Sequence, residues 1–153
     1  MIGVDDPVLG QAIRAYVALT DGAEALQDRM IELVPQFTLV LDIIHALEYL
    51  WLAANALLGE TNPERTAWVR ERLLHILSGQ TSTVVQDLEN QIRHAPLSPT
   101  QCEALKTTIG YYRRNSPYMC YDQYLNNGWP IGTGVVEGAC GHLVKDRIYC
   151  IKY

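Results

Sequence analysis

Residues 14–42 decide the fold, and they read RAYVALTDGAEALQDRMIELVPQFTLVLD. The run from Arg14 to Thr20 is short, apolar and partly β-branched, and it stops at the turn signal Asp21-Gly22. We therefore expect a buried strand there. A second run of this kind covers 37–41 and also ends in an aspartate, Asp42.

An amphipathic helix is expected between these two strands. Leu26, Met30, Leu33 and Val34 recur at helical spacing, and Pro35 closes the run. Strand, helix and strand together predict a βαβ unit with a parallel pair of strands.

Everything after Asp42 is expected to be mainly helical. The first predicted helix covers 43–58, and the second begins at Asn62-Pro63 and ends near Gly79. A third helix carries Val84, Leu88 and Ile92, and a fourth begins with a capping box at Ser98-Pro99. One or two helical turns follow at 118–125, and a last helix is predicted from Val136 to about Ile148. The fold class predicted is α/β but mostly helical.

Length and charge limit the function classes. A chain of 153 residues with 48% hydrophobic composition is long enough for one core and short for two domains. The net charge of -5 gives no overall basic surface, so contacts to nucleic acid would have to come from local patches.

Cysteine usage and the termini point to a cytoplasmic protein. The four cysteines form no C-x-x-C pair, and the acidic N-terminal stretch lacks the pattern of a secretory signal. The longest apolar stretch, 43–58, is interrupted by polar residues and is too short to span a bilayer comfortably. We expect no membrane contact.

Two aspartates are the first candidates for chemistry. Carboxylates at the C-terminal ends of parallel strands face the crevice where α/β sheets place ligands, so Asp21 and Asp42 qualify. The alternative is that each is a turn or N-cap residue. Asp42 and His45 lie one helical turn apart and could form a metal pair, a general base with its orienting group, or a cap, of which we favour the structural role.

Further candidates lie toward the C-terminus. Glu137 follows the glycine-rich stretch 131–134 near the start of the last predicted helix, where the helix dipole alone would favour a carboxylate. The basic pairs could meet phosphates or be solvated surface: Arg113 with Arg114, and Lys145 with Arg147. The aromatic residues that precede this stretch could pack in the core or stack on bases: Tyr111, Tyr112, Tyr118, Tyr121, Tyr124 and Trp129.

Several of these strings resemble transposases of the Kra group of bacterial insertion sequences. They are YYRRNSPYM at 111–119, WPIGTGVVEGAC at 129–140 and HLVKDR at 142–147, preceded in the same order by VALTDG at 17–22 and LDIIHALEYLW at 41–51. The resemblance covers nearly the whole chain. These transposases are similar to the RNase H-like nucleotidyl transferases, in which two aspartates and a glutamate hold two divalent ions.

The resemblance implies a role for each candidate. Asp21 would be the second catalytic aspartate and Glu137 the glutamate, both binding Mg²⁺ or Mn²⁺, and Asp42 with His45 would be an accessory element. The segment 43–128 would be an all-α insertion in a partial RNase H-like catalytic domain covering 1–153. The partners implied are the terminal inverted repeats of the insertion sequence and target DNA, with homo-oligomers possible.

The sequence also departs from the family's pattern. The family's first aspartate lies on a strand well upstream of the second, whereas twenty residues precede Asp21 here. We therefore expect a truncated domain, inactive by itself, with an unpaired sheet edge. Three alternatives remain open: a non-catalytic DNA-binding or regulatory fragment, a helical protein unrelated to DNA, and completion of the acidic triad by another fragment in trans.

Overall fold

A βαβ unit opens the part of the chain that this computed structural model describes, residues 15–133. Strands β1 (Tyr16–Thr20) and β2 (Phe37–Leu41) pair in parallel over their whole length. Helix α1 (Glu24–Leu33) crosses between them, as a parallel pair requires. The predicted order of strand, helix and strand is confirmed, and so is the parallel pairing.

Helix α1 differs from the expectation in the face that it buries. Its apolar stripe is largely exposed, with Leu26 at 47% and Leu33 at 71%, and the buried residue is Gln27. The Gln27 amide donates a hydrogen bond of 2.9 Å to Oδ1 of the buried Asn115. The two described strands offer too little apolar surface to cover the stripe, so a polar contact attaches the helix instead.

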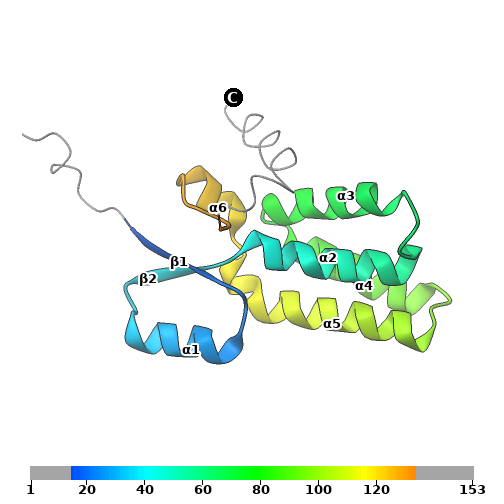
Figure 1. The fold of residues 1–153 in the computed structure, drawn as a ribbon, viewed down its shortest axis with the longest axis horizontal. Coiled ribbons are helices and arrows are strands. Elements are labelled where there is room, and N and C mark those ends of the chain that lie inside the picture. The colour runs from blue at the N-terminus through cyan, green and yellow to red at the C-terminus, as the bar shows by residue number, and fades with distance from the viewer. Residues whose placement is uncertain (1–14, 134–153) are drawn as a thin grey trace, which may run out of the picture.

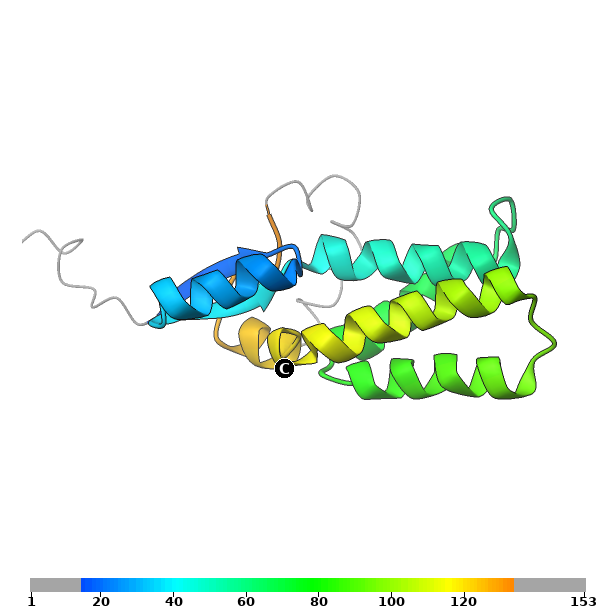
Figure 2. The same cartoon turned by 90° about the horizontal axis from the view of Figure 1, so that it is seen from below.

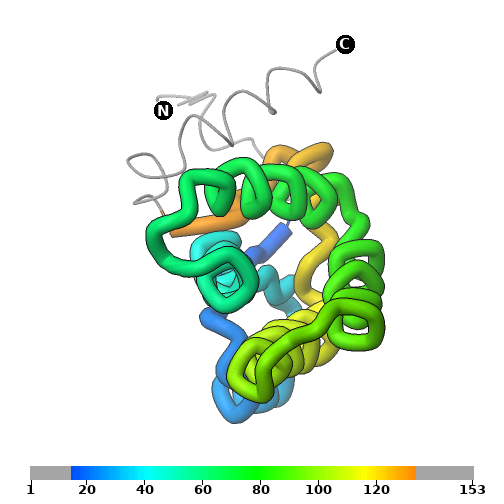
Figure 3. The backbone as a smooth tube through the Cα atoms, turned by 90° about the vertical axis from the view of Figure 1, so that its right-hand side faces the viewer, coloured from blue at the N-terminus to red at the C-terminus, as the bar shows by residue number. Residues whose placement is uncertain are grey.

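The remaining helices form a bundle beside the sheet (Figure 1). Its members are α2 (Ile43–Leu58), α3 (Arg65–Leu77), α4 (Thr81–His94) and α5 (Pro99–Asn115). Helices α2 and α4 each contact both α3 and α5, so the members close into a ring, which Figures 2 and 3 show from two directions. A 3₁₀ turn, η1 (Ser116–Tyr118), and the short α6 (Tyr121–Asn126) bring the chain back toward the sheet.

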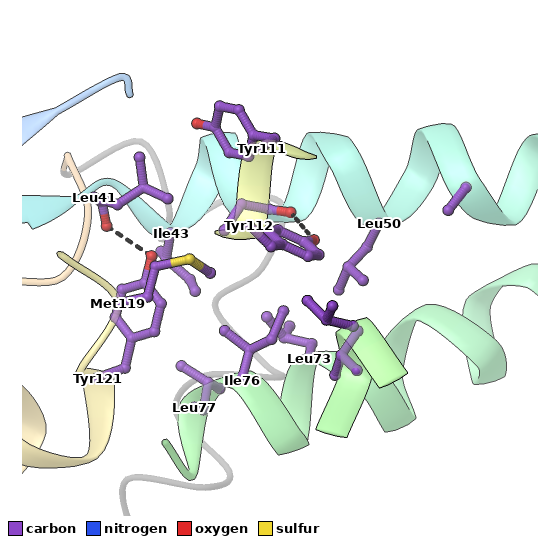
Figure 4. Packing of buried hydrophobic residues seen from close by; sticks show 14 of the residues in the cluster. Leu41, Ile43, Leu50, Leu73, Ile76, Leu77, Tyr111, Tyr112, Met119 and Tyr121 are labelled. Carbon is purple, nitrogen blue, oxygen red and sulfur yellow. Dashed lines mark hydrogen bonds between the residues drawn. The ribbon is translucent and has the colours of Figure 1, made fainter. Parts of the chain in front are cut away.

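The core lies inside this ring and extends to the end of β2. Leu50, Leu73, Ile76 and Tyr112 are almost completely buried and pack together in Figure 4. Because α2 follows β2 directly, Leu41 and Ile43 carry the same core into the sheet. The observed fold is mostly helical with a small parallel sheet, as predicted.

Helix starts follow the sequence signals with one exception. The capping box at Ser98 is present: its Oγ accepts from Gln101 N at 3.2 Å, and Gln101 Oε1 accepts from Ser98 N at 2.8 Å. Asn62 does not start α3, because its side chain accepts from Glu64 N in a separate turn and the helix begins only at Arg65.

The aromatic cluster is core, at least for its buried members. Tyr112 and Tyr121 are fully buried, and their hydroxyls donate to Ala46 O at 2.7 Å and to Leu41 O at 2.8 Å. Burial raises the pKa of both phenols well above the ordinary value. Rings in this position cannot stack on bases, so the core-packing alternative is the correct one for these two.

Candidate functional site at the carboxyl edge of the sheet

The two strands end side by side at one edge of the sheet. Thr20 and Leu41 are the last paired residues, and Asp42 N donates to Thr20 O at 2.8 Å. Asp21 and Asp42 therefore start from neighbouring positions. The predicted position of each aspartate directly after the C-terminal end of a parallel strand is confirmed.

Asp21 is exposed and forms part of a tight turn. Its Oδ1 accepts from Ala23 N at 2.9 Å, and the preceding Thr20 Oγ1 accepts from Gly22 N at 3.0 Å. Gly22 has a φ of 85°, a conformation that glycine adopts at no steric cost. Asp21 is thus a turn residue, and its exposed carboxylate is also open to a ligand.

Helix α5 holds this turn in place. The Tyr111 hydroxyl donates to Asp21 O at 2.8 Å, and the Arg114 guanidinium donates to Gly22 O at 3.1 Å. Burial raises the pKa of Tyr111, which keeps the hydroxyl protonated as a donor. These positioning contacts were not predicted, because Tyr111 and Asp21 are 90 residues apart and no local pattern links them.

Asp42 is a structural residue. It is 5% exposed, its Oδ1 accepts from Ile44 N at 2.9 Å, and its Oδ2 accepts from Thr133 N at 3.0 Å. Asp42 therefore caps α2, as the structural alternative held. Both oxygens of this buried carboxylate thus accept a backbone N–H, which fits the structural role.

His45 does not pair with Asp42 through its side chain. Its Nδ1 lies 3.0 Å from Glu48 Oε2, in an exposed pair on the next turn of α2. The contacts of Asp42 fit the structural role that we favoured for this pair, because its carboxylate accepts from two backbone amides.

The described part of the glycine-rich stretch, 131–133, reaches the same edge. Ile131 is buried, and its carbonyl accepts from Ile43 N at 2.8 Å, beside the bond between Thr133 and Asp42. Three predicted site residues, Glu137, Lys145 and Arg147, lie outside the described residues.

The two neighbouring arginines of α5 diverge. Arg114 binds the turn beside Asp21, and its guanidinium carbon lies 5.6 Å from the centre of the Tyr111 ring. Arg113 is exposed and pairs with Glu89 of α4. A contact between Arg113 and DNA thus stays a prediction, whereas the guanidinium of Arg114 binds the main chain of the Asp21 turn.

The described residues do not build a metal centre alone. Within 15–133, no three side chains of histidine, cysteine, aspartate or glutamate come together in a way that could hold an ion. Asp21 contributes one open carboxylate, whereas a pair of divalent ions needs several carboxylate oxygens at close range. Any such centre needs ligands from beyond this range.

No protein-family model, curated protein or solved structure matches this chain. The transposase resemblance therefore depends on the sequence strings alone. As to membranes, none of the helices in residues 15–133 is both long and apolar enough to cross one.

Proposed function

We propose that this chain is a partial RNase H-like domain of a DDE transposase, which cuts and joins DNA strands at the ends of an insertion sequence. One observation carries the proposal. The exposed Asp21 lies at the carboxyl edge of a parallel pair of strands, and the stretch that leads to Glu137 is hydrogen-bonded to that same edge.

Chain geometry supports bringing Glu137 near Asp21. Thr133 is held by Asp42 at the edge, and Glu137 follows four residues later. A segment of that length spans at most about 14 Å even when fully extended. The glutamate of the proposed site is therefore within chain reach of the strand ends.

The proposed roles follow from this arrangement. Asp21 and Glu137 would hold Mg²⁺ or Mn²⁺, which polarises the scissile phosphate and activates the attacking water or 3′-hydroxyl. Tyr111 and Arg114 are positioning residues, because they bind the carbonyl groups of Asp21 and of Gly22 directly after it. A third carboxylate, from another segment or another chain, would complete the site.

Divalent-ion binding tests the proposal. Mn²⁺ titration of the full chain, followed by paramagnetic relaxation, should give a site that weakens at least about tenfold in Asp21→Asn and in Glu137→Gln, since each loses a charged ligand. Asp28→Asn is the matched control, because Asp28 is an exposed aspartate on α1. Equal Mn²⁺ affinity in all variants would contradict the proposal.

A non-catalytic DNA-binding or regulatory fragment is the second candidate. It is favoured by the single open carboxylate that the described edge offers. Gel-shift titration with the terminal repeats at several salt concentrations separates the two candidates. DNA binding that is unaffected by Asp21→Asn and by added Mn²⁺ would favour the regulatory fragment.

A further inference from the structure

The outer edge of β1 is open within residues 15–133. Asp42 N donates to Thr20 O, so the backbone groups of Thr20 point toward β2. Successive residues of a strand direct these groups to alternate sides, so those of Ala18 also face β2, whereas those of Val17 and Leu19 face outward. No hydrogen bond joins the backbone of Val17 or Leu19 to another described element.

The outer edge of β2, by contrast, is covered. The Tyr121 hydroxyl donates to Leu41 O at 2.8 Å, and η1 packs against the strand. Strand β2 is buried from Leu39 to Leu41, whereas Tyr16 at the start of β1 is 46% exposed. The described sheet can therefore be extended only beside β1.

The sequence of β1, YVALT at 16–20, lacks the features that protect a free edge. Natural edge strands use charged side chains, proline or bulges to prevent pairing with another chain. Strand β1 has no charged residue and no proline, and it pairs with β2 without a bulge. Apolar residues on both faces are typical of an interior strand. The sequence of β1 thus suits a strand with a neighbour on each side.

The exposed stripe of α1 lies on the same side as this open edge. The Gln27 amide binds Asn115, which directly precedes η1 at the covered edge of β2. Each residue turns a helix by about 100°, so Leu26 and Leu33 lie at least about 100° around α1 from Gln27. These two leucines therefore face away from the covered edge and toward the side of β1.

We propose that two copies of this chain pair through the open edges of β1, antiparallel and about a two-fold axis at Ala18. In this register Val17 lies opposite Leu19 of the second copy, and the two residues exchange N–H···O=C bonds. The axis passes between two alanines, whose small side chains allow close approach. The pairing joins the two small sheets into a continuous one.

The position of α1 favours a second copy over another occupant. Helix α1 covers one face of the two strands that it joins, as Figure 2 shows, and neighbouring strands lie about 4.8 Å apart. The two copies of α1 would therefore run antiparallel roughly 10 Å apart, close to the 8–10 Å at which helices pack. Leu26 would meet Leu33 of the second copy. A single added strand would leave this stripe exposed.

The residues before β1 fit the open edge less well. A neighbouring segment can add to an edge through a tight hairpin, which requires a second run of strand-forming residues. Asp5, Asp6 and Pro7 disfavour a strand in that segment. The occupant that suits both the edge and the stripe is thus a second copy.

The pairing should be weak. Each copy contributes a strand of 5 residues and a helix of 10, which makes an interface at the small end of the specific ones. We expect a dissociation constant of about 10–100 µM, so that the chain is monomeric near 1 µM. The inference does not depend on the transposase assignment, because it uses no ligand of the proposed metal site.

Sedimentation equilibrium of the full chain tests the pairing. Between about 1 and 500 µM the average mass should rise toward twice that of one chain and no further, because a two-fold contact closes. Val17→Pro should keep the chain monomeric, because it removes an outward N–H and no bond to β2. Val17→Thr is the matched control, since it keeps the N–H and should still pair. A monomer throughout, or a mass that rises beyond the dimer, would overturn the proposal.

A polar substitution on the stripe tests the helix contact without altering the sheet. Leu26→Gln should weaken pairing at least about tenfold, because the symmetric contact loses two buried leucines. Ile31→Gln is the matched control: Ile31 is 49% exposed against 47% for Leu26, but it lies on the Gln27 side of α1. Circular dichroism checks that both variants are folded. Equal effects of the two substitutions would overturn the two-fold arrangement.

Amide hydrogen exchange identifies the edge that pairs. The N–H groups of Val17 and Leu19 should exchange severalfold more slowly at about 500 µM than at about 10 µM, because they become bonded in the dimer. Unchanged exchange of these two groups while the mass doubles would show that the copies join at another surface, and the proposal would be wrong.

Discussion

The βαβ unit and the helical bundle are held together by different interactions. Leu50, Leu73 and Leu88 are at most 1% exposed inside the bundle, and Val40 and Leu41 of β2 belong to the same core. Tyr16, Leu26 and Leu33 of β1 and α1 are 46%, 47% and 71% exposed. This outer part of the βαβ unit is attached to α5 by polar bonds such as those of Gln27 and Tyr111.

This difference indicates which part of the molecule should unfold first. Segments with few buried apolar contacts unfold locally at lower free energy than a packed core. The candidate site lies at the junction of the two regions, so its geometry depends on the weaker one.

Truncation of a core leucine should separate the two regions most clearly. Leu73→Ala should lower the free energy of unfolding by about 2–5 kcal/mol, because it leaves a cavity in the bundle. Leu33→Ala should change it by less than about 0.5 kcal/mol, as at an exposed position. Urea unfolding followed by circular dichroism measures both, and similar losses would mean that the stripe of α1 is covered.

Gly22→Ala should loosen the βαβ unit without loosening the bundle. The left-handed backbone costs an alanine about 1–2 kcal/mol, and the new Cβ would lie 2.6 Å from the Tyr111 hydroxyl oxygen. Gly59→Ala is the matched control, because Gly59 has a φ of 84° and no atom near the new Cβ. Hydrogen exchange should accelerate in β1 and α1 for Gly22→Ala alone. Unchanged exchange in these two elements would show that Tyr111 does not hold the turn.

The buried amide pair should account for much of the attachment of α1. Asn115→Ala leaves the Gln27 amide unpaired and should destabilise α1 by about 1–3 kcal/mol. A double-mutant cycle with Gln27→Ala, read by hydrogen exchange in α1, measures the coupling. Strictly additive effects would show that the pair does not join the two regions.

Alkaline pH should weaken the bundle through its buried tyrosines. The folded pKa of Tyr112 is raised by burial, so its protonated phenol is fully compatible with the fold below the unfolded pKa of 10.0, and stability falls as pH rises above that value. One such tyrosine contributes about 1.4 kcal/mol per pH unit to this fall. Tyr112→Phe should flatten the slope by that amount in urea unfolding above pH 10, and an unchanged slope would contradict it.

Local signals in the sequence predicted much of the fold. The strand ends at Asp21 and Asp42 and the capping box at Ser98 depend on neighbours within a few residues, so pattern and turn chemistry suffice. Asp42, which follows the second strand, caps α2, and this structural role is the one that we favoured.

These local signals could not predict the long-range contacts. The bond of Asp42 to Thr133 spans 91 residues, and that of Gln27 to Asn115 spans 88. The second of these also reversed the expected buried face of α1, since a polar residue replaces the apolar stripe. Periodicity gives the apolar side of a helix but not what lies against it.

The Asp42 carboxylate also sets an order of events during synthesis on the ribosome. Its Oδ1 can cap α2 as soon as Ile44 has emerged, because the two residues are neighbours. Its Oδ2 must wait for Thr133, so the edge beside Asp21 closes only after the whole bundle has been translated. Within residues 15–133, the bond between Asp42 and Thr133 is thus among the last that a nascent chain can form.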